Sequence, residues 1–211
     1  MPRAWSNSLR RSVTSAPATS LLPERIETVA HRAGNRLADI RAAIEAGVDW
    51  IEADIWWQHG RLEARHEHAI WSPRILIDLK GPARRLPHDV VRTLRAEGAV
   101  ERSAICGRNW RLLDAALAIE PGLCAIYSIG TERELAAVRG RPPEEPPIRA
   151  VSCEESLLTA PVIAWLRERD IAIFAWTVNE CGRALELANL GVSAIISDSI
   201  EVLDSVHTSF A

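Results

Sequence analysis

Short runs of apolar, β-branched residues alternate with stretches of helical periodicity from residue 28 onward. Such alternation is typical of parallel βαβ units. Strands are predicted at residues 28–31, 50–55, 75–80, 104–106, 124–129, 150–153, 171–178 and 194–197. Helices are predicted at residues 37–46, 88–97, 110–119, 132–138, 161–168 and 182–190. Eight parallel strands with helical crossovers and no internal break predict one α/β domain over residues 26–211, a closed TIM-type (β/α)8 barrel.

The connection between the second and third strands is shorter than the others. Residues 59–60 (His-Gly) are typical of a turn, and residues 62–66 can pair back on the second strand as a small hairpin arm. Only residues 67–74 then remain before the third strand. Because so short a segment leaves little room for a full helix, we expect a compact barrel with a thin wall there.

The composition excludes several classes of protein. Of the 211 residues, 47% are hydrophobic, and the net charge is -3. A nearly neutral chain without a basic stripe after residue 36 is not expected to bind nucleic acid. No apolar run approaches the roughly 20 residues that span a bilayer, so no transmembrane segment is expected.

The N-terminal segment, residues 1–25, differs in composition from the rest. It is rich in Ser and Arg, and it contains neither an acidic residue before Glu24 nor an apolar stretch of the kind found in secretory signals. We therefore expect a disordered arm, with a transit peptide as the alternative, and a cytoplasmic protein.

Charged side chains gather where the first three predicted strands end. Residues two apart on a strand face the same side, and the active sites of such barrels lie at the carboxyl ends of the strands. The three strand ends are therefore expected to bring these side chains to one rim of the barrel. They are His31, Arg32, Glu52, Asp54, Asp78 and Lys80.

The three carboxylates of this rim predict a metal site. Glu52, Asp54 and Asp78 cannot all be ionised side by side without compensating positive charge, and one lysine does not supply enough. A divalent cation that prefers oxygen ligands, Mg²⁺ or Ca²⁺, would supply it. Alone, the Glu52-x-Asp54 pair is more typical of a surface ion pair, but its occurrence together with the other rim residues favours a site.

The remaining rim residues suit a phosphodiester anion. Lys80 is the single lysine among 25 Lys and Arg residues, which favours a specific need for a compact ammonium there. Together with the cation, Arg32 and Lys80 would leave a positive pocket for a small-molecule phosphodiester. Hydrolysis needs one proton removed and one supplied, and the imidazoles of His31 and His66 can share these tasks. His59 and His68 are nearby alternatives to His66.

Trp176 lies near the end of the strand predicted at residues 171–178, and Asn179 follows that strand. The indole of Trp176 can either pack in the core or meet the alcohol or a choline-like cation of a substrate. Asn179 is placed where it can form a hydrogen bond at the rim of the pocket. Both are candidate substrate-pocket residues.

The order of these motifs resembles the signature of the glycerophosphodiester phosphodiesterase family: His31-Arg32, then Glu52-Ala53-Asp54, then His66. Residues 45–54, 174–179 and 191–198 are also similar to the surrounding family sequence, and the resemblance runs over residues 29–203. It implies that His31 and His66 are acid and base. It also implies metal binding by Glu52, Asp54 and an acidic residue of the third strand. The family often has Glu-x-Lys there, whereas Asp78-Leu-Lys80 is similar to the related sphingomyelinase D enzymes.

This chain also departs from the family pattern. Of the usual Pro-Glu-Asn-Thr segment only Asn35 is in register, Glu67 replaces the usual Asp after the second histidine, and the insertion that normally follows is nearly absent. The resemblance implies hydrolysis of glycerophosphodiesters to glycerol phosphate and an alcohol, at a more open pocket. Two alternatives remain: phospholipase D-like cleavage of lysophospholipids or sphingolipids with a cyclic phosphate product, and a non-catalytic barrel that binds a phosphorylated ligand. The shortened connection motivates the last alternative, and the two histidines argue against it.

Overall fold

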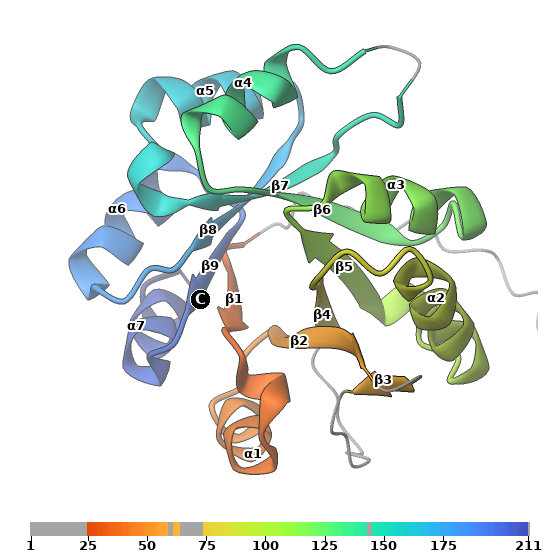
Figure 1. Ribbon diagram of the computed structural model, residues 1–211. Helices are drawn as coiled ribbons and strands as arrows, with labels where there is room; N and C mark the ends of the chain where they lie inside the picture. The colour runs from red at the N-terminus through yellow and green to blue at the C-terminus, as the bar shows by residue number, and fades with distance from the viewer. Residues whose placement is uncertain (1–24, 59–60, 64–73, 143–144, 211) are drawn as a thin grey trace, which may run out of the picture.

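A computed structural model of the chain describes residues 25–58, 61–63, 74–142 and 145–210 (Figure 1). Its strands are β1 (Glu27–Ala30), β2 (Trp50–Gln58), β3 (Arg61–Glu63), β4 (Arg74–Leu79), β5 (Ser103–Gly107), β6 (Cys124–Ile129), β7 (Ala150–Glu154), β8 (Ala172–Trp176) and β9 (Ala194–Ser197). The α-helices are α1 (Leu37–Glu45), α2 (Leu86–Ala96), α3 (Trp110–Ile119), α4 (Glu132–Arg139), α5 (Ala160–Arg167), α6 (Cys181–Leu190) and α7 (Ile200–Phe210). Short 3-10 helices are η1 (Ala33–Asn35), η2 (Val100–Arg102) and η3 (Glu155–Leu157).

The predicted barrel fold is confirmed. All strands except β3 are parallel, and β1 pairs with β9 on one side and with β2 on the other, which closes the sheet. The α-helices surround the strands (Figure 1). The predicted domain begins at residue 26. The proposed arm, residues 1–25, lies outside the described residues except for Arg25, so it stays a prediction.

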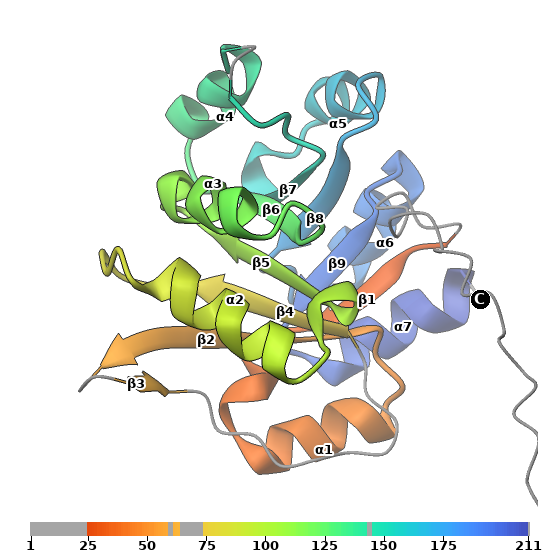
Figure 2. The ribbon, with the colours of Figure 1, turned by 90° about the vertical axis from the view of Figure 1, so that its right-hand side faces the viewer.

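Strand β3 forms the first part of the predicted hairpin arm and lengthens β2, while residues 64–66 of that arm lie outside the described residues. Antiparallel β3 pairs with the last three residues of β2, with Trp56 opposite Glu63 and Gln58 opposite Arg61 (Figure 2). This pairing explains why β2 runs three residues beyond its predicted end at residue 55. Residues 64–73, which hold nearly all of the predicted short crossover, lie outside the described residues, so the thin wall there stays a prediction.

The C-terminal helix α7 was missing from the sequence prediction. Val202, Leu203 and Val206 are buried within it and belong to the core between barrel and helices. The spacing of these three residues places them on one helix face, which was a usable signal. No helix in the described part of the chain is long and apolar enough to cross a membrane.

The core has two layers because alternate residues of each strand face opposite sides. One set packs within the barrel and includes Val29, Trp50 and Phe174. The other set, such as Ile51 and Ile77, packs outward against the helices. At the carboxyl ends of the strands, polar side chains replace the apolar residues of the interior set.

A partly buried ionic network lies at the opposite, amino-terminal end of the barrel. Trp50 Nε1 donates to Glu27 Oε2 at 2.7 Å, and Arg74 forms an ion pair with the same carboxylate. The Arg74 guanidinium also lies over the Trp50 ring, 4.1 Å from the ring centroid. One glutamate thus joins three adjacent strands.

Glu27→Ala is expected to lower the free energy of unfolding by about 3 kcal/mol, because it leaves the Trp50 N–H and the Arg74 guanidinium unpaired. Urea denaturation measures this change. Glu45→Ala, at an exposed carboxylate on α1, is the matched control and should change stability by less than about 0.5 kcal/mol. Equal effects of the two substitutions would contradict a structural role for Glu27.

Candidate active site

The three predicted metal-binding carboxylates meet at the carboxyl ends of β2 and β4. The parallel register places Asp54 directly beside Asp78, and Glu52 precedes Asp54 by two residues on the same face. One carboxylate oxygen from each of the three residues lies within 4.8 Å of the others. Glu52 is buried, while Asp54 and Asp78 are partly exposed.

The segment that follows β1 holds two of these carboxylates in place. The Arg32 N–H donates to Glu52 Oε2 at 2.7 Å, and Asn35 Nδ2 donates to Asp54 Oδ2 at 3.0 Å. Asn35 Oδ1 in turn accepts from the Asp54 N–H at 3.0 Å. Gly34 allows this close approach, since a Cβ there would lie 2.5 Å from the Cβ of Ala53.

Lys80 supplies the nearest full positive charge. Its Nζ lies 2.5 Å from Asp78 Oδ2 and 3.1 Å from Asp54 Oδ1. Burial alone would lower the pKa of Lys80, but these two carboxylates outweigh that effect and raise it. The ammonium is therefore charged at neutral pH and compensates part of the negative cluster.

Lys80 compensates the third carboxyl, Glu52, only weakly, because its charge is the smallest of the effects on the pKa of that group. Burial raises the pKa of Glu52 to about 7; the Arg32 N–H opposes this rise, and the charges of Asp54 and Asp78 add to it. A divalent cation among three oxygen ligands would remove this deficit, because it replaces a proton at the site with greater positive charge. The donor set and its spacing thus fit Mg²⁺ or Ca²⁺.

Cation affinity is expected to depend on pH. Below about pH 7 Glu52 holds a proton that a cation must displace, so affinity should fall by about tenfold per pH unit of acidification. Titration calorimetry of Ca²⁺ and Mg²⁺ at several pH values between about 5.5 and 8 measures this. In Glu52→Gln the affinity should be much weaker and nearly independent of pH over this range. An affinity of the wild-type protein that does not change with pH would contradict a role for Glu52.

His31 lines the same cavity as Lys80 and is oriented by Asp198. The two side chains meet through His31 Nδ1 and Asp198 Oδ1 at 2.8 Å. Burial tends to raise the pKa of Asp198, but hydrogen bonds from Asn179 and His31 lower it overall. Because an ionised carboxylate only accepts hydrogen bonds, Nδ1 must carry a proton, and Nε2 of the neutral ring remains available to accept one.

Asn179 supports this pair instead of lining the cavity. Its Nδ2 donates to Asp198 Oδ2 at 3.2 Å, and its Oδ1 accepts from the Asp198 N–H at 3.0 Å. Its predicted role at the substrate stays a prediction, and its hydrogen bonds in the structure are with Ser197 and Asp198. Sequence reasoning did not assign Asp198 to His31. Closure of the barrel was the available signal, because the paired ends of β1 and β9 make the two residues neighbours.

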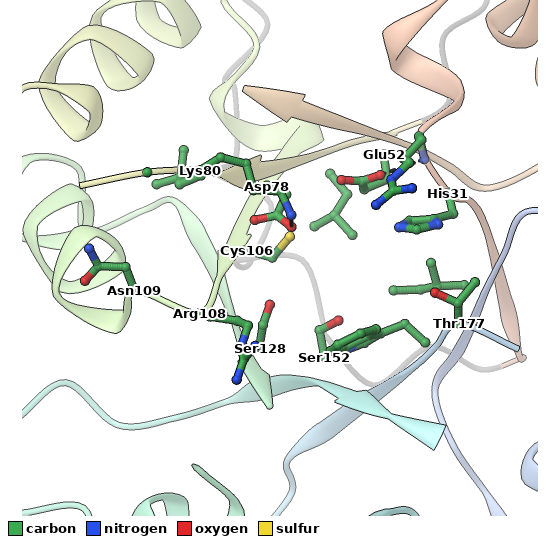
Figure 3. A pocket seen from close by; sticks show the side chains of 16 residues that line it. His31, Glu52, Asp78, Lys80, Cys106, Arg108, Asn109, Ser128, Ser152 and Thr177 are labelled. Carbon is green, nitrogen blue, oxygen red and sulfur yellow. Dashed lines mark hydrogen bonds and ion pairs between the residues drawn. The ribbon is translucent and has the colours of Figure 1, made fainter. Parts of the chain in front are cut away.

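A cavity of about 370 Å³ lies beside His31 and the carboxylates Glu52 and Asp78. His31, Glu52, Asp78 and Lys80 line one side of it. The other side comes from the ends of β5 to β8, and of its polar and aromatic residues only Trp176 was predicted (Figure 3). These residues are Arg108, Asn109, Ser128, Ser152, Trp176 and Thr177.

The structure describes Arg32 but not the second predicted catalytic histidine, His66. Arg32 lines the cavity, but its side chain is 63% exposed, with Nε 3.7 Å from Asp54 Oδ2. His66 lies outside the described residues, as do its alternatives His59 and His68. The structure therefore brings His31, Arg32, Lys80 and the three carboxylates together and leaves the second histidine as a prediction.

Comparisons with known proteins give matches by structure alone. No protein-family model matches the chain, and no curated protein matches its sequence. A provisionally assigned glycerophosphoryl diester phosphodiesterase from Silicibacter pomeroyi is similar with a TM-score of 0.75 and 14% identity, over 91% of this chain and 97% of that one. A glycerophosphodiester phosphodiesterase from Parabacteroides distasonis is similar with a TM-score of 0.71 and 14% identity, over 88% and 98% of the two chains.

A third similar structure was solved with a product bound. It is an Oleispira antarctica phosphodiesterase in complex with sn-glycerol-3-phosphate, at a TM-score of 0.71 and 16% identity, over 90% of this chain and 99% of that one. Each match spans nearly the whole of both chains, while the identities are low. The likeness therefore establishes the fold: this chain has the same barrel architecture as these phosphodiesterases.

Proposed function

We propose that the protein is a member of the glycerophosphodiester phosphodiesterase family that hydrolyses glycerophosphodiesters to glycerol phosphate and an alcohol, with a divalent cation. The observation that carries this proposal is the cluster of Glu52, Asp54 and Asp78, which lies beside Lys80 in one cavity with His31. The shared barrel fold supports it, and the product bound to the Oleispira antarctica enzyme suggests the class of substrate.

The carboxylates, the two cationic side chains and His31 have separate roles in this reaction. A cation held by the three carboxylates would stabilise negative charge that develops on the phosphoryl oxygens. Lys80 and Arg32 would bind the other phosphoryl oxygens as cationic donors. His31 is held by Asp198 with Nε2 ready to accept a proton from the attacking oxygen or, once protonated, to donate one to the leaving alkoxide.

His66 is the proposed partner of His31 in acid–base catalysis. His66→Asn is expected to lower kcat by about 10²- to 10⁴-fold, because either proton removal or leaving-group protonation is lost. The same substitution at His59 and at His68 provides matched controls from the same segment, and each should leave kcat within about twofold of wild type. The pattern of the three kcat values decides the assignment: a large loss at His59 or His68 alone would transfer this role to that residue.

The reaction products test the proposed function. Purified protein with Mg²⁺ or Ca²⁺ is incubated with glycerophosphocholine and with a lysophospholipid, and phosphorus NMR identifies the phosphate species. We expect glycerol phosphate from the first substrate. A cyclic phosphate from the second, without glycerol phosphate from the first, would favour the phospholipase D-like alternative. Phosphate-ligand binding without turnover would favour the non-catalytic barrel.

A cytoplasmic location stays a prediction from the sequence.

A further inference from the structure

We infer that the side of the cavity formed by β5 to β8 binds the alcohol half of the substrate, and that this half carries an anionic group which Arg108 recognises. The inference rests on the proposed function and narrows its substrate class to diesters with a phosphate or carboxylate on the alcohol. Arg108 follows directly after β5, across the cavity from Glu52 and His31 (Figure 3).

Arg108 is held in place through one edge of its guanidinium. Its Nε and Nη2 donate to Glu134 Oε1 at 3.1 and 2.9 Å, and no described residue forms a hydrogen bond with Nη1. The other oxygen of Glu134 accepts from the Gly130 N–H at 2.8 Å and from Thr131 Oγ at 3.0 Å, at the start of α4. Glu134 is therefore a fixed support, and the Arg108 side chain remains 58% exposed at the cavity.

Arg108 and Trp176 both lie against Gly130. A Cβ at Gly130 would lie 3.4 Å from Arg108 Cζ and 3.4 Å from Trp176 Cη2, so the guanidinium and the indole flank the same glycine. Trp176 also lines the cavity, and its buried Nε1 has no hydrogen-bond partner among the described residues. Arg108 and Trp176 thus form a continuous part of the cavity surface.

Two serines add hydroxyl groups to this surface. Ser128 of β6 and Ser152 of β7 are partners in the parallel register, are buried, and line the cavity. Among the hydrogen bonds of the described residues, neither hydroxyl takes part in one. Adjacent hydroxyls that face the cavity without partners are placed to bind oxygen atoms of a ligand.

The chemistry of this side favours an anion over a cation. Its polar groups include the Arg108 guanidinium and two hydroxyls, and Glu134, the carboxylate paired with Arg108, accepts hydrogen bonds from Arg108, Gly130 and Thr131. A choline-like group would meet the positive charge of Arg108, whereas a phosphate or carboxylate would form charge-assisted hydrogen bonds with it. The alcohol half is therefore expected to carry an oxyanion.

Substrate pairs that differ in one group test this inference. The kcat/KM is measured for glycerophosphoglycerol, for its terminal phosphate ester, and for glycerophosphoglycerate, in which the alcohol carries a carboxylate. The wild-type protein is expected to prefer at least one anionic substrate over the neutral one by about 10- to 100-fold. The anionic substrate with the higher kcat/KM shows whether a phosphate or a carboxylate is the group that is recognised.

Variants of Arg108 assign the preference to this residue. Arg108→Gln should reduce the anionic-to-neutral ratio of kcat/KM by about tenfold or more, and Arg108→Lys should retain part of it because the charge remains. Arg111→Gln, at an exposed arginine of α3 that does not line the cavity, is the matched control and should keep the wild-type ratio. A neutral or choline-bearing substrate preferred by the wild-type protein, or a ratio that Arg108→Gln does not change, would overturn the inference.

Binding separates this inference from the proposed reaction. Calorimetry with non-hydrolysable phosphonate analogues of the same substrates reports the preference without turnover. If the protein hydrolyses none of the diesters but binds the anionic analogue more tightly through Arg108, the subsite stands and the proposed hydrolysis fails. If it hydrolyses all of these diesters with equal kcat/KM, the proposed hydrolysis stands and the anionic subsite fails.

Discussion

Asp78→Asn is expected to lower kcat for diester hydrolysis by about 10³-fold or more and to remove the response to added divalent cation. Asp78 provides one of three carboxylate oxygens that lie within 4.8 Å of one another, and Asn keeps the shape of the side chain while removing its charge. A bound cation contributes several kcal/mol to the stabilisation of developing charge, and each 1.36 kcal/mol corresponds to about a tenfold change in rate.

The measurement is the initial rate of bis(p-nitrophenyl) phosphate hydrolysis as a function of Mg²⁺ or Ca²⁺ concentration. Asp204→Asn, at an exposed carboxylate of α7, is the matched control and should behave as wild type. Asp78→Asn with wild-type kcat and an unchanged cation response would show that Asp78 is not a ligand.

The second large effect is expected for His31. His31→Asn should lower kcat by about 10²- to 10⁴-fold, the usual contribution of one acid–base group. Asp198→Asn should cost less, about 10- to 100-fold, because the imidazole remains while the partner that fixes its ring orientation and tautomer is altered. The 2.8 Å contact between His31 Nδ1 and Asp198 Oδ1 is the basis for this order of effects.

Steady-state kinetics of the two single variants and the double variant measure this coupling. If Asp198 acts through His31, the double variant should be about as slow as His31→Asn alone. His207→Asn on α7 is a histidine control outside the cavity and should not change kcat. A larger loss from Asp198→Asn than from His31→Asn would contradict the proposed roles.

The carboxylate cluster could be predicted from sequence because its geometry is local. Glu52 and Asp54 are two residues apart on one strand, so they share a face wherever that strand lies. Asp78 ends the next parallel strand of the barrel, and parallel strands bring their carboxyl ends together at one rim. The observed pairing of Asp54 with Asp78 needs only these two rules.

The partners of His31 and the far side of the cavity depend on closure of the whole barrel. Asp198 is 167 residues from His31 in sequence, and only the pairing of β1 with β9 makes them neighbours. Ser128 and Ser152 are small polar residues in mostly apolar strands, where a buried packing residue is the usual interpretation. Arg108 is one of many arginines, and its position after β5 marks it only once the cavity is known.

The boundaries of β2 show a similar limit. Its apolar pattern continues through Trp56 and Trp57, whereas the predicted strand ends at residue 55. The antiparallel pairing with β3 extends it to Gln58. Local periodicity cannot set such a boundary, because the partner strand decides it.

Removal and restoration of the metal test the proposed activity most directly. The protein is treated with EDTA and dialysed, and hydrolysis of bis(p-nitrophenyl) phosphate and glycerophosphocholine is measured before and after addition of Mg²⁺ or Ca²⁺, in wild type and in Asp78→Asn. We expect no turnover without metal, turnover that returns with one of the two cations in wild type, and no recovery in Asp78→Asn. Turnover at the full rate in EDTA, or no turnover of either diester by folded wild-type protein with either cation, would contradict a metal-dependent phosphodiesterase.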